Sequence, residues 1–296
     1  MIKLEGVYTV LPTPFDERGN FDSESLRRVI DLFIEDGVSG FTALGVTSEV
    51  ARISDRERHA ILDATMKHTN GRVPVIVGAT GDGLDTCLGY CEDAHKAGAA
   101  GVMVSPPRMA KLNSNYIRRH FATIAEKFDY TIVVQDFPPI SGYHMEASLL
   151  VDICRQIPSA RTIKLEDAPT PYKTARIRDL EDGLGINIFG GLGGGYLIEE
   201  LISGANGAMT GFAYPKLLVE TVSKWNAGKH DEAADFFYRH VPIMRFEFQP
   251  GIGMAIRKEI LKRRGALAHA GIRLPGAELD ESTKAALDRV LKWLDL

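Results

Sequence analysis

Short apolar segments alternate with amphipathic segments along most of the chain. Runs of about five residues rich in Val, Ile and Phe recur eight times, and stretches with the apolar spacing of helices separate them. The eight runs are VYTVL, GFTAL, VPVIVG, GVMVS, TIVVQ, RTIKL, INIFG and GAMTG. Strands that alternate with helices are typical of a mainly parallel sheet. We therefore expect eight strands, each followed by a helix.

The predicted helices begin and end with residues that favour helix termini. Ser54 is followed three residues later by Glu57, a spacing typical of a capping box, and Asp22 or Ser23 can cap the first long helix. The pattern Gly, two residues, Gly, strand appears in DGVSGFTAL, AGAAGVMVS and SGANGAMTG. Glycine adopts a positive φ at little cost, so the first glycine of each copy is expected to end a helix: Gly37, Gly98 and Gly204.

The number and spacing of these units predict a closed barrel. Eight units of about 27 residues fill positions 5 to about 227, which is the usual size of a (β/α)8 barrel. A doubly wound open sheet is the alternative, but the even spacing gives no sign of a second domain. The strand pattern stops after Gly228, and helices are expected near 230–246, 251–265 and 280–294. The sequence thus predicts an α/β protein with a TIM barrel over 1–228 and a C-terminal extension of three helices over 229–296.

Composition favours a globular protein without polyanionic partners. Hydrophobic residues make up 45% and charged residues 25%, and 35 basic against 39 acidic side chains give a net charge of -4. No block of like charges follows a phosphate backbone, so nucleic acid is not expected as a partner. No apolar run reaches the roughly 18 residues that span a bilayer. The opening segment MIKLEGVYTVLPTPF also lacks the pattern of a signal peptide. We expect a cytoplasmic protein with no membrane partner.

The cysteines give little reason to expect a disulfide or a metal. An odd, small number of them argues against a disulfide framework: Cys87, Cys91 and Cys154. Cys87 and Cys91 share a helix face, but two thiols with no histidine at a ligand spacing make a weak metal site. We expect reduced thiols packed in the core and no bound metal.

The barrel geometry selects a short set of candidate site residues. In a (β/α)8 barrel, the reacting groups lie at the C-terminal ends of the strands and in the loops that follow. The rule selects Gly45 to Glu49 after strand two, Arg108 after strand four, Gln135 and Asp136 after strand five, Lys164 in strand six, the glycine run at 190–195 after strand seven, and Met209 to Gly211 after strand eight.

Lys164 is the most unusual of these candidates, because its charged side chain lies between Ile163 and Leu165 in the apolar run RTIKL. A strand conformation directs its side chain away from both neighbours and into the barrel mouth. Burial favours the neutral form of an amine, which is the form that attacks a carbonyl carbon. From spacing alone, a strand-end lysine that pairs with Glu166 or Asp167 is the simpler interpretation.

Four segments resemble the family that contains dihydrodipicolinate synthase and N-acetylneuraminate lyase. They are the opening strand with Thr13-Pro14, GVTSE at 45–49, DFPPISG at 136–142 and IKLED at 163–167. They occur in the family's order and near its spacing, and the similarity runs from about Lys3 to the C-terminal helices. The resemblance implies that Lys164 forms a Schiff base with pyruvate or another 2-oxo acid, as in class I aldolases. It implies no cofactor, since the imine is the electron sink, and it suggests a homotetramer built from dimers.

The resemblance also implies roles for residues around this lysine. Gly45, Thr47 and Ser48 lie in the segment that holds the substrate carboxylate, with Thr47 as a ligand and Ser48 as a second donor in place of the family glycine. The backbone of Met209 lines the bound pyruvate. Gly191, in the glycine-rich loop, borders the distal end of the substrate.

The chain departs from the family at the proton relay. Gln135 stands where the family has a catalytic tyrosine, Val46 replaces the first threonine, and Arg108 replaces the tyrosine lent by a neighbouring subunit. An amide does not change its protonation near neutral pH, so Gln135 can orient a substrate or a water without acting as acid or base. Ile140 stands where the synthases carry an arginine for the second substrate. These departures put synthase activity in its usual form in doubt.

Several groups are open as replacements for the missing relay, and three functions are open with them. The groups are Asp136, Tyr8, Tyr143, Tyr214 and the carboxylate of the substrate itself. The leading hypothesis is a class I lyase of the aldolase type that acts on a 2-oxo acid. The second keeps the imine but dehydrates or deaminates a 2-keto-3-deoxy acid. The third is a barrel that binds a 2-oxo acid without turnover.

Overall fold

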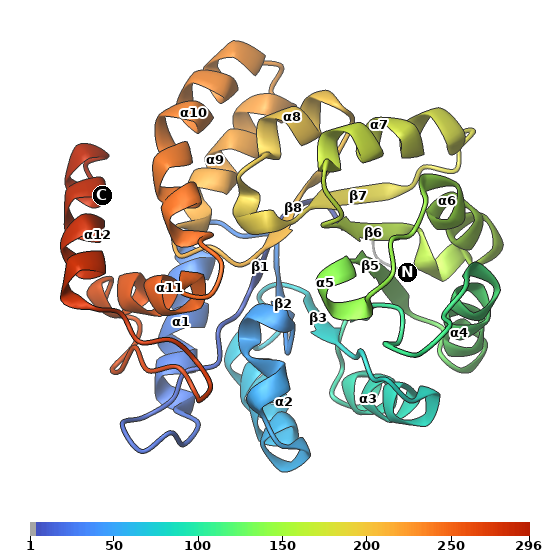
Figure 1. Ribbon diagram of the computed structural model, residues 1–296, viewed down its shortest axis with the longest axis horizontal. Coiled ribbons are helices and arrows are strands. Elements are labelled where there is room, and N and C mark those ends of the chain that lie inside the picture. The colour runs from blue at the N-terminus through green and yellow to red at the C-terminus, as the bar shows by residue number, and fades with distance from the viewer. Residues whose placement is uncertain (1–3) are drawn as a thin grey trace.

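Eight parallel strands close into a barrel, with each strand bonded to the next and β8 bonded to β1 (Figure 1). The computed structural model describes residues 4–296; residues 1–3, including Lys3, at which the family resemblance begins, lie outside the described range. Each strand overlaps one of the eight predicted runs, so the predicted (β/α)8 barrel is confirmed. The strands are β1 (Gly6–Val10), β2 (Gly40–Ala43), β3 (Val75–Gly78), β4 (Gly101–Val104), β5 (Thr131–Asp136), β6 (Thr162–Leu165), β7 (Asn187–Gly190) and β8 (Gly207–Thr210).

Helices surround the strands on the outside, as Figure 1 shows. They are α1 (Ser23–Glu35), α2 (Asp55–Thr69), α3 (Leu84–Lys96), α4 (Ser114–Lys127), α5 (Pro138–Ser141), α6 (Ala147–Gln156), α7 (Thr170–Leu180), α8 (Leu197–Ile202) and α9 (Pro215–Asn226). The extension adds α10 (His230–Glu247), α11 (Gly253–Arg263) and α12 (Glu281–Trp293), close to the three predicted ranges. Within residues 4–296, no helix is both long enough and apolar enough to cross a membrane. The division of the chain into domains at residue 228 stays a prediction.

The helix termini follow the predicted capping chemistry. The Ser54 side chain accepts a hydrogen bond from the backbone N–H of Glu57, whose carboxylate reaches back to the Ser54 backbone, which completes the capping box of α2. Asp22, rather than Ser23, caps α1 by accepting from two backbone N–H groups. The three predicted helix-ending glycines all have positive φ: 85° at Gly37, 79° at Gly98 and 98° at Gly204.

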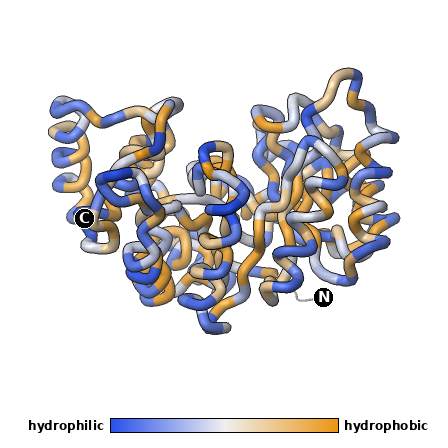
Figure 2. Tube along the Cα trace, turned by 90° about the horizontal axis from the view of Figure 1, so that it is seen from below, coloured by the Kyte–Doolittle hydropathy of each residue, from blue (hydrophilic) through white to orange (hydrophobic). Residues whose placement is uncertain are grey.

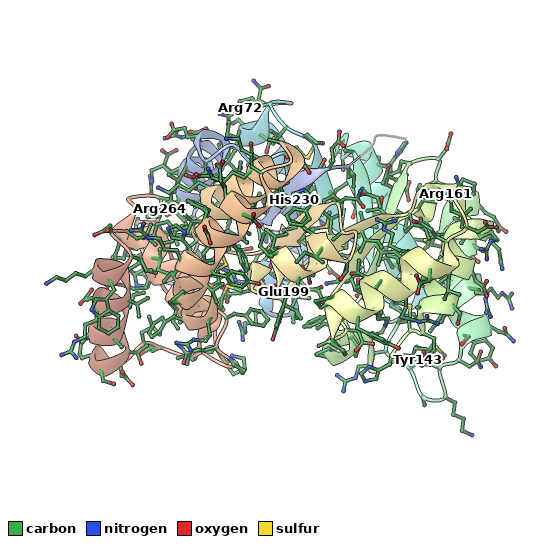
Figure 3. All side chains as sticks on the ribbon, turned by 90° about the horizontal axis from the view of Figure 1, so that it is seen from above. Arg72, Tyr143, Arg161, Glu199, His230 and Arg264 are labelled. Carbon is green, nitrogen blue, oxygen red and sulfur yellow. The ribbon has the colours of Figure 1, made fainter. Side chains whose placement is uncertain are left out.

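Apolar side chains fill two layers, one inside the barrel and one between the strands and the helices. The inner cluster consists of Leu4, Tyr8, Ile76, Met103, Val133, Phe189 and Met209. The outer layer is larger and contains the buried faces of the helices, including the three free cysteines. Figure 2 shows apolar stretches toward the interior and polar stretches along the outer helices, and Figure 3 shows Arg72 at the rim of the molecule. Because side chains alternate along a strand, this layering decides which residues face the barrel mouth.

A buried ion pair attaches the C-terminal extension to the loop after β2. Glu49 adopts a left-handed conformation with φ of 60°, and its side chain is fully buried. The Nζ of Lys258 in α11 donates to Glu49 Oε1 at 2.5 Å, and the backbone N–H of Arg273 donates to Glu49 Oε2 at 3.1 Å. A charge buried without a partner is costly, so each partner requires the other. The pair therefore fixes the loop that carries residues 45–48.

We expect Lys258→Met to lower the free energy of unfolding by about 3–5 kcal/mol, because the Glu49 carboxylate would lose its buried partner. Urea unfolding at neutral pH measures the change. Lys284→Met is the matched control, because the Lys284 pair with Glu281 lies at the surface, and its loss should barely move the transition. A Lys258→Met variant that unfolds at the same urea concentration as the control would contradict the role of the pair.

Candidate active site

Lys164 lies on the inner face of β6 and is 5% exposed. Its partners in register are Gln135 on β5 and Phe189 on β7. The Lys164 Nζ is 3.3 Å from Glu166 Oε2, and the same oxygen accepts a hydrogen bond from Gln135 Nε2 at 2.8 Å. Ser105 Oγ donates to Gln135 Oε1 at 3.0 Å, which fixes the orientation of the amide. We call Lys164, Glu166, Gln135 and Ser105 the Lys164 cluster.

Glu166 is the functional candidate that sequence reasoning treated only as a charge partner. It is largely buried, and it brings a carboxylate to the amine inside the barrel. A carboxylate can take up and return a proton, whereas the amide of Gln135 cannot. The signal was available in the sequence: Glu166 follows Lys164 by two positions, and residues two apart along a strand direction face the same side. The cluster therefore combines a buried amine with a carboxylate whose chemistry allows proton exchange.

The two hydroxyl groups of the segment after β2, those of Thr47 and Ser48, have different environments. Ser48 Oγ donates to the Leu11 carbonyl at 2.6 Å and accepts from the Gly45 N–H at 3.1 Å. Its hydroxyl thus holds the loop together, which corrects the expectation that Ser48 offers a second donor to a ligand. Thr47 Oγ1 is buried and has no hydrogen-bond partner within residues 4–296. Thr47 therefore has the hydroxyl of this segment that is left without a partner among the described residues, and its role as a carboxylate ligand stays a prediction.

Asp136 lies in a different environment from the one expected. Its Oδ2 accepts from Lys173 Nζ in α7 at 2.5 Å, and Lys173 also contacts Asp167 at 2.9 Å. Burial raises the pKa of Asp136 to about 6, although Lys173 opposes the shift. Because neighbouring strand residues face opposite sides, Asp136 points away from the face that carries Gln135. Asp136, a candidate site residue and a candidate relay, thus contacts Lys173 in α7 rather than the Lys164 cluster.

Each of the three tyrosines considered as relays has a contact of its own in the structure. Tyr8 packs inside the barrel edge-on to Phe189 at 5.7 Å, and burial raises its pKa to about 12. The Tyr143 hydroxyl is 3.0 Å from Ser114 Oγ, and the Tyr214 ring lies 4.8 Å from the Arg264 guanidinium. Figure 3 places Tyr143 and Arg264 toward opposite ends of the molecule. Glu166, by contrast, lies in direct contact with Lys164.

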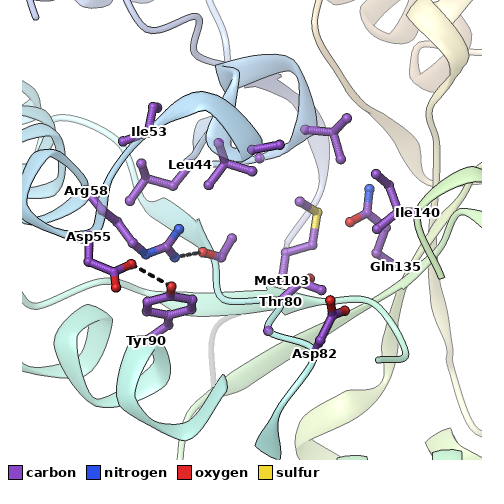
Figure 4. A pocket seen from close by; sticks show the side chains of 16 residues that line it. Leu44, Ile53, Asp55, Arg58, Thr80, Asp82, Tyr90, Met103, Gln135 and Ile140 are labelled. Carbon is purple, nitrogen blue, oxygen red and sulfur yellow. Dashed lines mark hydrogen bonds between the residues drawn. The ribbon is translucent and has the colours of Figure 1, made fainter. Parts of the chain in front are cut away.

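A cavity of about 300 Å³ opens beside the Lys164 cluster (Figure 4). Gly45, Gln135 and Ile140 line it, so the structure brings these three expected site residues together. Polar side chains also line it, among them Arg58, whose guanidinium lies over the ring of Tyr90.

Arg108 reaches the rim of this cavity by its backbone. The backbone N–H of Arg108 donates to Asp82 Oδ1 at 3.1 Å, and Asp82 is one of the lining residues. The Arg108 side chain itself is exposed. Met209 on β8 is fully buried with its side chain in the inner core, and the expected contact of its backbone with pyruvate stays a prediction.

Two consecutive glycines at the end of β7 make room for two carboxyl groups. A Cβ on Gly191 would lie 2.3 Å from Glu166 Cγ, and a Cβ on Gly190 would lie 1.7 Å from Glu200 Oε2. Thr170 Oγ1 donates to Glu200 Oε1 at 2.6 Å, while Oε2 has no partner within residues 4–296. Burial raises the pKa of Glu200 to about 7. Gly191 is thus a close neighbour of Glu166, and its expected place at the distal end of the substrate stays a prediction.

Glu200 is expected to make stability depend on pH. Its pKa is raised from the ordinary value of 4.5 to about 7, so its neutral form is favoured in the folded state. Its contribution to stability is therefore present below about pH 4.5 and is lost as the pH rises through about 7, by about 3 kcal/mol in total. Glu200→Gln should remove this loss and be more stable than the wild type at pH 8, in urea unfolding across this range. Parallel pH profiles for the two proteins would contradict the assignment.

Comparisons with known proteins agree on one family. The model of the dihydrodipicolinate synthetase family matches residues 3–294. The L-2-keto-3-deoxyarabonate dehydratase of Azospirillum brasilense is 30% identical over 296 residues, which cover 98% of this chain and 94% of that protein. A 4-hydroxy-tetrahydrodipicolinate synthase of Methanococcus maripaludis is 29% identical, with 99% of both chains covered. The crystal structure of a dihydrodipicolinate synthase from Rhodopseudomonas palustris superposes with a TM-score of 0.92 at 32% identity, covering 98% of this chain and 97% of that one.

Proposed function

The chain belongs to the dihydrodipicolinate synthetase family, as the four sequence segments predicted, and we propose that it is a lyase that dehydrates a 2-oxo-3-deoxy acid through an imine to Lys164. The observation that carries the proposal is the 3.3 Å contact between Lys164 Nζ and Glu166 Oε2 inside the barrel. The contact supports the proposal because it brings an amine and a carboxylate together inside the barrel.

The first step is the condensation of Lys164 with the substrate. The neutral Nζ attacks C2 of the 2-oxo acid, the C2–O bond breaks, and one water leaves as the protonated imine forms. The negative charge of Glu166 stabilises the positive nitrogen, and the amide of Gln135 holds the carboxylate in place. The free hydroxyl of Thr47 and the backbone of Gly45 are the groups we assign to the substrate carboxylate.

The second step is the removal of a proton from C3. In the imine, C3 is bonded to the carbon that carries Nζ, so a carboxylate beside Nζ lies close to the C3 protons. Glu166 takes one of these protons. The electron pair of the broken C3–H bond then forms the C2–C3 double bond of the enamine, and the imine nitrogen becomes neutral. The enamine then expels the C4 hydroxyl, which takes a proton from the water set free in the first step and leaves as water. Glu166 returns its proton to the hydroxide that remains. Hydrolysis of the resulting unsaturated imine frees Lys164 and the product.

Elimination is favoured over aldol cleavage by the position of the acid–base group. An acid or base must lie within hydrogen-bond reach of the proton that it transfers. Aldol cleavage begins with the proton of the C4 hydroxyl, and the residue in the position of the family tyrosine is Gln135, which cannot accept a proton. The similarity to a dehydratase at 30% identity supports the same choice.

Aldol cleavage that releases pyruvate is the second candidate, because it uses the same imine and the family includes enzymes of that type. The two reactions differ in their products. Dehydration releases no pyruvate, whereas cleavage releases one pyruvate for each substrate consumed. The lining of the cavity by Ile140, where the synthases carry an arginine, argues against condensation with a second carboxylate substrate.

Borohydride reduction in the presence of pyruvate should attach one reduced pyruvate to the peptide that contains Lys164, as detected by mass spectrometry. The buried amine next to a carboxylate is the reason to expect the adduct at this lysine. Lys164→Arg keeps the charge but cannot form the imine, and it should give no adduct and no turnover. Lys173→Arg is the control, because Lys173 is a second largely buried lysine, and this variant should keep the adduct on Lys164. An adduct on another lysine, or none at all, would remove the proposal.

Glu166→Gln should still form the imine with pyruvate but lose turnover by about 10²–10⁴-fold, because the amide cannot carry the C3 proton. Nuclear magnetic resonance in D2O measures the proton transfer directly, through deuterium exchange at C3 of pyruvate. Asp167→Asn is the matched control, since Asp167 contacts Lys173 and His144 rather than Lys164, and it should keep the exchange within a few-fold. Exchange at the wild-type rate in Glu166→Gln would show that another group transfers the proton.

A further inference from the structure

Two buried polar atoms beside the substrate segment lack partners. Thr47 Oγ1 and Arg257 Nη1 are both buried without a hydrogen bond to any residue in the range 4–296. Arg257 belongs to α11 in the C-terminal extension and is 4% exposed. An unsatisfied donor on a buried guanidinium is costly, so such a group in a native structure calls for a binding partner.

Gly211 shows that the two atoms face the same space. A Cβ at this position would lie 2.0 Å from Arg257 Nη1 and 2.8 Å from Thr47 Oγ1. Gly211 follows β8 and comes two positions after Met209, whose side chain is inside the barrel. Position 211 is therefore directed toward the barrel mouth. Any larger residue here would collide with the guanidinium, so the glycine admits Arg257 to the site.

The guanidinium is held in place from behind. Arg257 Nε donates to Glu247 Oε1 at 2.6 Å, and Glu247 Oε2 accepts from the Ala213 N–H at 2.9 Å. Glu247 is itself buried at the end of α10. These contacts fix the plane of the guanidinium and leave Nη1 on the side of Thr47.

The hydrogen-bonding capacities of the two groups determine what they can bind together. A guanidinium only donates, and a threonine hydroxyl has a single proton. When Nη1 donates to Thr47 Oγ1, the threonine hydroxyl acts as the acceptor for the arginine. Its own proton then points to the ligand, which has to present a hydrogen-bond acceptor. A carboxylate oxygen is such an acceptor, and it also gains from the positive charge of the arginine.

We propose that Arg257 is the positioning residue through which the site selects a carboxylate. On binding, Nη1 donates to Thr47 Oγ1, and the Thr47 hydroxyl donates to the carboxylate of the 2-oxo acid held on Lys164. The inference rests on the proposed function, because it takes the bound ligand to be a 2-oxo acid. It assigns to the C-terminal extension a part in substrate selection.

The test compares a charged ligand with a neutral one of the same shape. Pyruvate and pyruvamide both carry the reacting carbonyl, and borohydride trapping on Lys164 at increasing concentrations gives the half-saturating concentration of each. The wild type should prefer pyruvate. Arg257→Met should need about 10–100-fold more pyruvate, the range expected for a hydrogen bond to a charged group, with little change for pyruvamide. Arg257→Lys should fall between them, since it keeps the charge but not the planar fork.

Arg264→Met is the matched control, because Arg264 donates to the Ala213 carbonyl of the same loop without facing Thr47. It should keep the wild-type preference for pyruvate. A purely structural role of Arg257 would weaken both ligands equally or neither. An unchanged preference in Arg257→Met therefore overturns the inference.

Thr47→Val provides an independent route if Arg257→Met does not fold. It removes the hydroxyl without disturbing the buried pair of Arg257 and Glu247, and it should lose the preference for pyruvate to a similar degree. An unchanged preference in Thr47→Val also overturns the inference. Absence of any adduct in the wild type would instead overturn the proposed function, so the two failures are distinguishable.

Discussion

The site depends on the cost of placing an amine inside an apolar barrel. A lone ammonium group there would lose its hydration without compensation, which is far more expensive than any single contact can repay. Glu166 resolves this conflict, because its carboxylate lies 3.3 Å from Lys164 Nζ. The carboxylate in turn requires Gln135 as a donor and Gly191 as a residue without a side chain. The carboxylate that makes the buried lysine tolerable is the same group that carries the C3 proton in the proposed mechanism.

The C-terminal extension takes part in this arrangement through buried charges. Lys258 reaches Glu49 after β2, while Arg257 and Glu247 reach the loop after β8. Both loops border the barrel mouth on the side of Thr47. Because buried pairs hold strict geometry, the extension fixes the position of the loops that we assign to the substrate carboxylate. Helices α10 and α11, which lie outside the barrel, thus hold the loops that we assign to substrate binding.

The fold was predictable because its signals are local. Each strand is a short apolar run, and each helix carries its own periodicity and caps, as at Ser54 with Glu57 and at Gly37. The position of Lys164 was predictable for the same reason, since alternation in RTIKL directs it inward. The closed order of eight strands followed from the number and size of the units.

The less predictable features depend on contacts between distant segments. Ser48 has the right chemistry for a carboxylate ligand, but the Leu11 carbonyl uses its proton. Asp136 follows Gln135 directly, yet it faces Lys173 on the other side of β5. Arg257 is far from Thr47 in the sequence and becomes its neighbour only when α11 packs beside β8. Such pairings are set by three-dimensional packing and leave no spacing pattern in the chain.

The most direct test of the central claim is a crystal structure of the protein after a 2-oxo-3-deoxy acid has been bound and reduced with borohydride. The account predicts continuous density from Lys164 Nζ to C2 of the ligand, with a Glu166 oxygen within hydrogen-bond distance of C3. A ligand bound without a covalent link, or one whose C3 faces a group other than Glu166, would contradict it.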